Sequence, residues 1–301
     1  MSGLSNHTLL INELIGFCKE TRGWPCPLKD LGYKPELIEP AFKNTKGETV
    51  HPDILFSSNR LLHAMLAECK GGACLEGEER AHLELQISRY KGVTNTDLKG
   101  IVSVYNPAQM TVDIALASLG EMAPLIEGYQ LPLFVFTEKK FERKNKFANQ
   151  QVDKLFPTEL VLESHPPTSY YPFSSDDDDS LIAMKVFQEI VSSTIRAGRN
   201  GLDFDAEHIL RGIHPHWANI GQGEQERLKK KVDRIIVKYH MAPQLNQKLQ
   251  RVGGRSWRVV GDLYNFKEGC LTIMRQLDED PGVGQSSLNV FTNRGLEEDA
   301  T

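Results

Sequence analysis

Two short apolar runs in the first quarter of the chain organise our interpretation of the sequence. One run begins directly after Asp53, and the other, residues 61–67, leads into Glu68, Cys69 and Lys70. Both have the length of a strand, and residues two apart on a strand lie on the same face. If the two strands pair as a hairpin, Asp53 comes near Glu68 and Lys70, while Cys69 points into the packing. The pattern therefore predicts two carboxylates and an ammonium at one end of a sheet.

The rest of the first half shows helical and strand periodicities in turn. We expect a loop over 24–35, an edge strand over 36–43 because Pro40 cannot donate to a neighbour, and strands over 100–105 and 131–137. The expected helices are residues 7–22, 76–91 and 110–127. Strand–helix–strand order favours parallel crossovers. The expected fold is α/β, a mixed sheet of four or five strands with helices on both sides.

The second half is expected to be a separate, helical domain. Helices are predicted from about 180 to Gly198, over 206–212 and over 222–240, and a hairpin then turns at Gly253 and Gly254. Three helices followed by a two-stranded hairpin form the outline of a winged-helix module. The stretch between the halves is rich in proline and contains four consecutive aspartates, which indicates a solvated linker. We therefore expect domains at 1–155 and 180–301, joined by a linker at 156–179.

The formal net charge is −5, so a nucleic-acid-binding surface on this chain would have to be local. One basic run, residues 138–154, is interpreted either as a solvated segment or as a patch that grips a phosphate backbone. A second lies in 221–260, where ten Lys or Arg residues stand against three acids. Our candidate nucleic-acid-binding residues there are Arg227, Lys230, Lys231, Arg234, Arg255 and Arg258. The alternative is a basic face that contacts an acidic protein.

No run of 18 or more apolar residues occurs, so we expect no membrane span. The N-terminal residues lack the basic and small-residue features of a secretory signal. The five cysteines are odd in number and scattered, which is typical of a reducing cytoplasm. The expected location is cytoplasmic.

The acids and the lysine suggest a family. Asp53 preceded by proline, and then Glu68-x-Lys70, resemble the PD-(D/E)xK phosphodiesterase superfamily of restriction-endonuclease-like nucleases. The predicted helix that follows contains Gln86-x-x-x-Tyr90, which is similar to the third motif of the RecB-like branch. These two residues are one helical turn apart and share a face. The resemblance covers roughly residues 7–140 and implies a restriction-endonuclease-like sheet.

The resemblance also implies a set of roles. Asp53 and Glu68 would hold one or two Mg²⁺ or Mn²⁺ ions, with the backbone carbonyl of Cys69 completing the shell. Lys70 would orient or deprotonate the attacking water, or neutralise charge on the phosphate. A glutamate of the first helix sometimes joins the metal shell in this family. Glu13 and Glu20 are the candidates, and each could instead lie on a solvated helix face.

Gln86 and Tyr90 would touch a phosphate, a base or a metal-bound water. The alternatives are a solvated glutamine and a core tyrosine.

The function expected is therefore Mg-dependent hydrolysis of phosphodiester bonds by an endonuclease, most simply in DNA, with RNA as the other substrate. Fold analogy suggests a bacterial restriction or phage-defence system. No P-loop pattern occurs, so an ATP-driven step would require an ATPase or helicase partner chain. Homodimerisation stays open. Two other hypotheses remain: a nuclease-like fold without activity that binds nucleic acid, and a subunit whose second half docks a partner.

Overall fold

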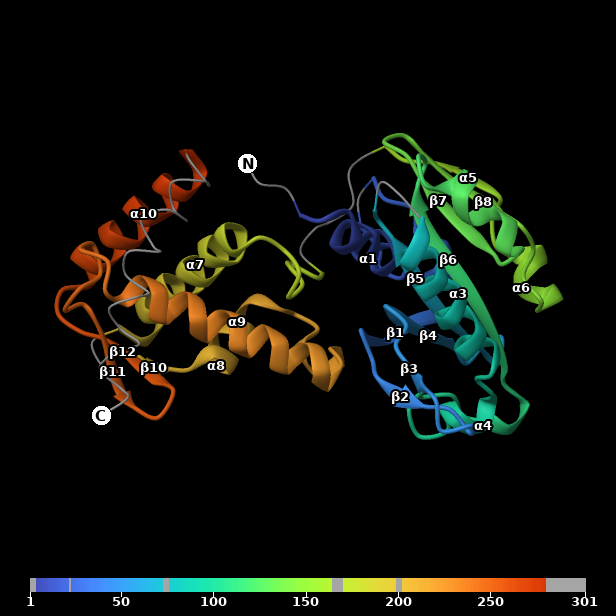
Figure 1. Cartoon of the computed structure of the whole chain (residues 1–301), viewed down its shortest axis with the longest axis horizontal. Coiled ribbons are helices and arrows are strands. Elements are labelled where there is room, and N and C mark those ends of the chain that lie inside the picture. The colour runs from blue at the N-terminus through green and yellow to red at the C-terminus, as the bar shows by residue number, and fades with distance from the viewer. Residues whose placement is uncertain (1–3, 22, 73–75, 164–169, 199–201, 280–301) are drawn as a thin grey trace. The chain divides into compact units, whose positions relative to one another are not determined.

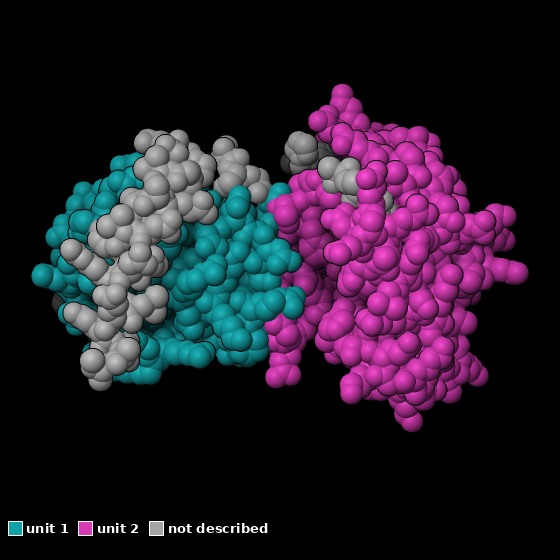
Figure 2. Space-filling view, viewed as in Figure 1, with its two compact units in different colours: residues 1–4, 173–217, 226–301 teal, residues 5–172, 218–225 magenta. Residues whose placement is uncertain are grey.

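The computed structural model describes residues 4–21, 23–72, 76–163, 170–198 and 202–279. These residues form two compact units, coloured separately in Figure 2. The sheet unit comprises the described residues of 5–172 and 218–225. The helical unit comprises those of 1–4, 173–217 and 226–301, that is Leu4 and the described residues from 173 to 217 and from 226 to 279.

A mixed seven-stranded sheet forms the centre of the sheet unit in the part of the chain that the structure describes (Figure 1). In spatial order its strands are β1 (Tyr33–Ile38), β4 (Ile54–Ser58), β5 (His63–Lys70), β6 (Thr111–Leu119), β7 (Leu133–Phe136), β8 (Lys140–Lys144) and β9 (Glu159–Val161). Strands β5, β6 and β7 run parallel to one another, and the remaining neighbours are antiparallel. The expected mixed sheet is confirmed, but it has seven strands where four or five were expected.

Helices pack on both faces of this sheet. On one face, Leu83 and Ile87 of α3 (Gly77–Lys91) pack against Leu116 of β6 and Val135 of β7. On the other face lies α1 (Asn6–Gly16), which contacts β5 and β6. Successive strand residues point to opposite faces, so the alternation along each strand decides which helix a side chain meets.

Shorter elements complete the sheet unit. They are α2 (Pro27–Asp30), β2 (Phe42–Lys43), β3 (Thr49–Val50), α4 (Asn95–Leu98), η1 (Pro107–Gln109), α5 (Ala123–Ile126), η2 (Glu127–Tyr129) and α6 (Gln150–Leu155). The first helix therefore ends earlier than the predicted 7–22, and the predicted loop over 24–35 contains α2 and the start of β1. The edge strand predicted over 36–43 is wrong in its bounds: the edge strand is β1, with Pro35 at a bulge, Pro40 lies beyond its end, and β2 pairs with β3 in a separate sheet.

The helix predicted over 110–127 is wrong. Residues 111–119 form the central strand β6, which is hydrogen-bonded to β5 and β7 and buried along most of its length. A strand covered on both faces has no polar side, so its apolar run resembles a buried helix in sequence. The strand predicted over 100–105 is also wrong, because that stretch makes only an isolated bridge between Lys99 and Val102. Parallel crossovers occur, but they connect β5 to β6 and β6 to β7.

The helical unit begins with α7 (Asp179–Ala197), β10 (Asp203–Phe204), α8 (Ala206–Ile213) and η4 (Trp217–Asn219), although the last residues of η4 belong to the sheet unit. Most of α9 (Gln222–His240), the hairpin β11 (Leu249–Gly253) and β12 (Ser256–Val259), and α10 (Leu263–Glu279) follow. The predicted helices and the hairpin are confirmed. Strand β10 and helix α10 were not predicted, and β10 adds a third strand in the order β10-β12-β11.

Part of the segment expected to be a linker has regular structure or is buried. Strand β9 belongs to the large sheet, and Tyr171 is buried in the sheet unit. In the helical unit, Ser174 and Asp177 are buried, and the Asp177 carboxylate accepts from the Ser174 backbone N–H at 2.6 Å. The run of aspartates therefore forms a capped turn before α7. Across the described residues, no helix has the length and apolar character needed to cross a membrane.

A distant segment covers the exposed edge of β1. The Gly221 N–H donates to the carbonyl of Ile38 at 2.7 Å, and Ile220 forms a parallel bridge with Ile38. A Cβ added at Gly221 would lie 2.1 Å from the carbonyl oxygen of Glu39. Only glycine therefore fits this approach of two backbones.

We predict that Gly221→Ala destabilises the chain by about 3 kcal/mol, because the backbones must separate to admit the methyl group. Gly223→Ala is the matched control. Its Cβ would meet nothing within 4 Å, so in α9 it should stabilise by about 0.5–1 kcal/mol. Thermal denaturation of both variants checks this expectation. Shifts of equal sign in the two variants would show that the close approach is unimportant.

Candidate functional site

The backbone pairing of β4 with β5 positions Asp53. The register places Ile54 opposite Ala67, so Asp53 stands opposite Glu68. The Asp53 N–H donates to the carbonyl of Ala67 at 3.0 Å, and its carboxylate accepts from the Cys69 N–H at 2.5 Å. The carboxylate is therefore fixed by the strand that carries the other predicted site residues.

Alternation along β5 separates its last three residues as the sequence predicted. Cys69 is 3% exposed, and its side chain lies on the opposite face from Glu68 and Lys70. Glu68 and Lys70 face α3, where the Lys70 Nζ donates to Glu68 Oε1 at 2.6 Å and to Gln86 Oε1 at 3.2 Å. The Tyr90 hydroxyl donates to Glu68 Oε2 at 2.6 Å. All four polar side chains therefore form one connected network.

Tyr90 is both a core residue and a member of the polar network, two roles that the sequence left open as alternatives. Its ring is 1% exposed and belongs to the apolar cluster under α3, so it is a core residue. Its hydroxyl nevertheless reaches the His51 carbonyl at 2.6 Å as well as Glu68. Burial and the negative charge of Glu68 hold the pKa of Tyr90 far above its usual value, so the hydroxyl remains a donor.

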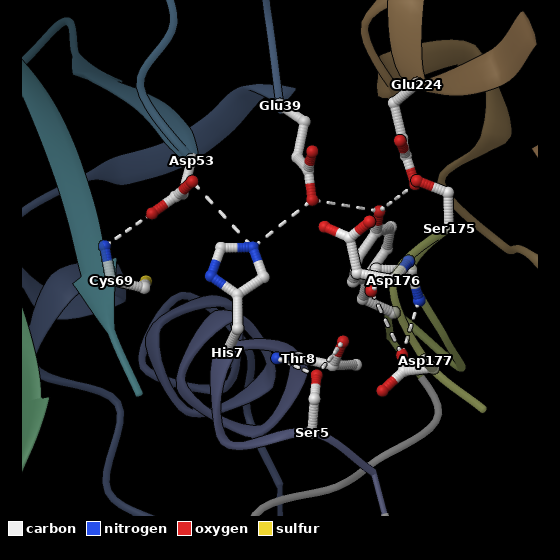
Figure 3. A network of polar contacts seen from close by, with 12 residues as sticks. Ser5, His7, Thr8, Glu39, Asp53, Cys69, Ser175, Asp176, Asp177 and Glu224 are labelled. Atoms are coloured by element: carbon white, nitrogen blue, oxygen red, sulfur yellow. Dashed lines mark hydrogen bonds and ion pairs between the residues drawn. The ribbon is translucent and has the colours of Figure 1, made fainter. Parts of the chain in front are cut away.

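His7 and Glu39 also belong to this cluster, and the sequence did not indicate either of them. Figure 3 shows the His7 ring between the two acids, with Nε2 at 3.3 Å from Glu39 Oε1 and 3.8 Å from Asp53 Oδ1. His7 comes from the first turn of α1, and Glu39 follows β1. Glu39 has a φ of +50°, a left-handed conformation that costs free energy in a non-glycine residue and is often found at functional sites. No spacing rule connects these positions, because only the tertiary fold brings them together.

The charges of the cluster strongly affect one another. Burial and the negative charge of Glu68 raise the pKa of Asp53 to about 7. Burial alone would lower the pKa of His7, but the charge of Asp53 and the hydrogen bond to Glu39 raise it to about 10. Burial would also lower the pKa of Lys70, yet Glu68 and Asp53 outweigh it and raise that pKa. Lys70 is therefore an ammonium ion.

The donor set suits a hard divalent cation. Two carboxylates lie at one strand end, burial and mutual repulsion disfavour their joint ionisation, and a cation would relieve that repulsion. A third protein ligand would come from the backbone carbonyl of Cys69. Among the described residues, no group of three His, Cys, Asp or Glu side chains stands in a metal-holding arrangement.

A small pocket adjoins the network. Its volume is about 160 Å³, and it is lined by Thr49, His51, His82, Gln86, Arg89 and Tyr90. Gln86 and Tyr90 are shared with the network, whereas the other wall carries a guanidinium and two imidazoles.

The basic candidates of the second half lie in the helical unit, where most are paired with acids of the same unit. Lys231 donates to the Ser175 carbonyl at 2.8 Å and lies 3.2 Å from Asp179. The other pairings are Arg227 with the Ser175 hydroxyl, Arg234 with Asp179, Arg255 with Asp233 and Arg258 with Asp203. Lys230 is exposed. The run at 138–154 contains β8 and α6, and Lys140, Arg143 and Lys144 pair with acids.

Comparison with known proteins identifies the family of the sheet unit. The chain belongs to the MJECL32 domain family, whose model matches residues 6–171. A second model, described as a domain of unknown function (DUF8601), matches residues 175–263. The two matches meet close to the division between the compact units. They therefore correspond to the sheet unit and the helical unit.

Among curated proteins, the chain is similar to the uncharacterized protein MJECL32 of Methanocaldococcus jannaschii. The two are 24% identical over 210 residues, which cover 64% of this chain and 47% of that protein. The chain thus spans about half the length of its curated relative. No solved structure matches the chain.

Glu13, the candidate on the first helix, is neither solvated nor joined to the cluster. It is 8% exposed, and its Oε2 has no hydrogen-bond partner. Burial alone raises the pKa of Glu13 to about 8, and no contribution from Asp53 or Glu68 adds to it. Glu20 is exposed and pairs with Lys29.

We predict that Glu13→Gln stabilises the chain at high pH and leaves it unchanged at low pH. A carboxyl whose pKa is raised on folding binds a proton in the folded state, so stability falls as pH rises from about 4.5 to about 8. The neutral amide of the variant would remove this loss, which amounts to a few kcal/mol by pH 9. Chemical denaturation at pH 5 and pH 9 measures it, with Glu20→Gln as the exposed control. An equal difference at both pH values would contradict the assignment.

Proposed function

We propose that this protein is a metal-dependent nuclease of the PD-(D/E)xK type, of the RecB-like branch, that hydrolyses phosphodiester bonds in DNA. The observation that carries the proposal is the connected network of Glu68, Lys70, Gln86 and Tyr90 beside Asp53. Sequence motifs from two strands and a helix converge there in the arrangement that the resemblance implies. The mixed sheet with helices on both faces supports a restriction-endonuclease-like fold.

Asp53, Glu68 and the backbone carbonyl of Cys69 would hold Mg²⁺ or Mn²⁺. When bound, the ion would polarise the phosphate and lower the pKa of a coordinated water. His7 holds Asp53 from the α1 side, and Glu39 in turn holds His7. This second layer fixes the carboxylate in the absence of substrate.

Lys70 acts as a fixed positive charge in this mechanism. Its ammonium lies beside Glu68 and would neutralise charge that develops on the phosphate oxygens. Gln86 orients the ammonium through its Oε1. Water adds to phosphorus, the ester P–O bond breaks, and the proton released by the water is balanced by protonation of the departing oxygen.

The pocket beside Gln86 supplies a position for the polynucleotide backbone. His51, His82 and Arg89 line it together with Gln86, whose Oε1 accepts from Lys70, so a second phosphate of the strand would bind on the far side of Gln86 from Lys70. The positive charge in this pocket is local, which is what an acidic chain requires in order to bind nucleic acid. We propose DNA as the substrate and RNA as the alternative.

For the helical unit we propose a winged-helix module. Its order of helices and strands, and the hairpin β11–β12 after α9, support this outline. Arg255 follows the turn of the hairpin and is exposed, as is Lys230 of α9, so these two are the strongest candidates for contact with DNA. Arg227 and Lys231 contact Ser175 in the turn before α7 instead, and Arg234 pairs with Asp179 at the start of α7.

Most of the basic candidates in the helical unit are paired within that unit, which leaves less positive charge for nucleic acid. This favours a second candidate function for the helical unit, the docking of a protein partner. By analogy of fold, the whole would act in a prokaryotic restriction or phage-defence system with an ATPase or helicase chain. A second copy of this chain is another partner we consider. If the sheet unit lacked activity, the protein would be a non-catalytic binding subunit.

We predict that the purified chain cleaves DNA with Mg²⁺ and that Lys70→Ala lowers the rate by about 10²–10³-fold, because the charge next to the phosphate is lost. Asp53→Asn should act in the same direction, and EDTA should abolish cleavage. Lys99→Ala, at an exposed lysine on the same unit, is the control. Single-turnover cleavage of labelled DNA measures the rates. Undiminished cleavage by the Lys70→Ala variant would exclude this mechanism, and absence of cleavage by the wild type would favour the binding subunit.

Arg89→Ala should weaken DNA binding with little effect on the rate at saturation, because a backbone contact acts equally on the ground and transition states. The salt dependence of binding should fall by about one unit in log–log slope. Arg80→Ala, on the same helix but paired with Glu84, is the matched control. Binding isotherms at several salt concentrations give the slope. An unchanged slope would show that the DNA backbone does not contact this pocket.

A further inference from the structure

A second cavity lies on the sheet unit, beside the network of Glu68 and Lys70 but lined by other residues. Its volume is about 770 Å³. The lining residues come from α1, from Trp24 and from the chain at the ends of β6 and β7: Asn6, Glu13, Trp24, Leu119, Gly120, Glu121, Phe136, Thr137, Glu138 and Leu162. The carboxyl ends of parallel strands are frequent ligand sites in α/β sheets. The volume is within the range of small-molecule pockets.

The chemistry of this groove is distinctive. Trp24, Phe136 and Leu162 are almost fully buried and provide apolar walls. Glu121 and Glu138 are exposed at the rim. Of the described lining residues, none is a lysine, an arginine or a histidine. The groove therefore combines apolar walls with carboxylates that no lining cation balances.

Two residues of the lining, Glu13 and Trp24, each have a buried polar atom, Oε2 and Nε1, without a hydrogen-bond partner among the described residues. The Glu13 side chain is 8% exposed, and one carboxylate oxygen is fully buried without a hydrogen-bond partner. Buried polar atoms in native proteins are nearly always paired, so an unpaired carboxyl that lines a cavity indicates a missing ligand. The burial that raises its pKa to about 8 is a cost that a bound cation would reverse.

This groove is distinct from the proposed nuclease centre. Glu68 and Lys70 face α3, whereas Glu13 comes from α1, on the opposite face of the sheet. Asn6 lines the groove, and its side-chain amide donates to the Gly71 carbonyl at 2.8 Å, just after Lys70. The two sites thus share a boundary but no side chain.

We propose that the groove binds a small organic cation, an amidinium or guanidinium on an apolar body, with Glu13 as its counter-ion. A planar cation with two N–H donors matches a carboxylate in bidentate geometry. Its apolar body would lie against Trp24 and Phe136. Glu121 and Glu138 at the rim attract the cation and repel anions such as nucleic acid. The occupant is therefore a ligand other than the polynucleotide of the proposed reaction.

Benzamidine tests this inference with the full chain, because it combines an amidinium with an aromatic ring. Isothermal titration calorimetry at pH 7 should show saturable binding at millimolar concentration, while benzamide, its neutral analogue, should not bind. Glu13→Gln should weaken benzamidine binding at least tenfold. Glu20→Gln, on an exposed glutamate of the same region, should bind as the wild type does.

The fold of the Glu13→Gln variant is checked by circular dichroism, since glutamine keeps the shape of the side chain. As a second measurement, the double change Glu121→Gln and Glu138→Gln at the rim should weaken binding by a smaller factor. Absence of saturable binding by the wild type would overturn the proposal. Equal binding of benzamide, or undiminished binding by Glu13→Gln, would do the same. None of these outcomes depends on nuclease activity.

Discussion

The antiparallel pairing of β4 with β5 is the constraint on which the site depends. It sets Asp53 opposite Glu68, and it lets the N–H of Cys69 hold the Asp53 carboxylate from the neighbouring strand. A shift of one residue in this register would turn Glu68 and Lys70 toward α1 and away from Gln86 and Tyr90. Since β5 also pairs along its whole length with β6, that shift would disrupt the centre of the sheet. The strand register that builds the core of the sheet therefore also fixes the geometry of the site.

In the site, the repulsion between two buried carboxylates is offset by neighbouring cations. Asp53 and Glu68 repel each other at low exposure, and Lys70 and His7 offset that repulsion from opposite faces of the sheet. Removing either cation would leave a buried carboxylate without compensation, which costs more than an exposed ion pair contributes. Such a cluster is poor for stability by itself. Under the proposed function it would bind a cation and an anionic substrate together.

The acidic residues around the start of α7 reduce the positive charge that the basic residues of α9 present to a partner. Asp177 is buried in a capped turn and Asp179 begins the helix, so the run of aspartates is folded rather than extended. Lys231 and Arg234 pair with it inside the helical unit. Ten basic residues against three acids in the sequence of 221–260 therefore overstate the charge that this surface presents, because the balancing acids come from elsewhere in the chain.

Local patterns determined much of this protein: the hairpin that ends in Glu68-x-Lys70, the helix with Gln86 and Tyr90, and the helices of the second half. Each of these depends on residues that are close in sequence, where periodicity and spacing suffice. The tertiary structure decided what depends on distant partners. It turned 111–119 into a central strand because both its faces are covered, and it brought His7 and Glu39 to Asp53. It also buried Glu13 without a partner, since burial is a property of the packed sheet and not of the helix that carries the side chain.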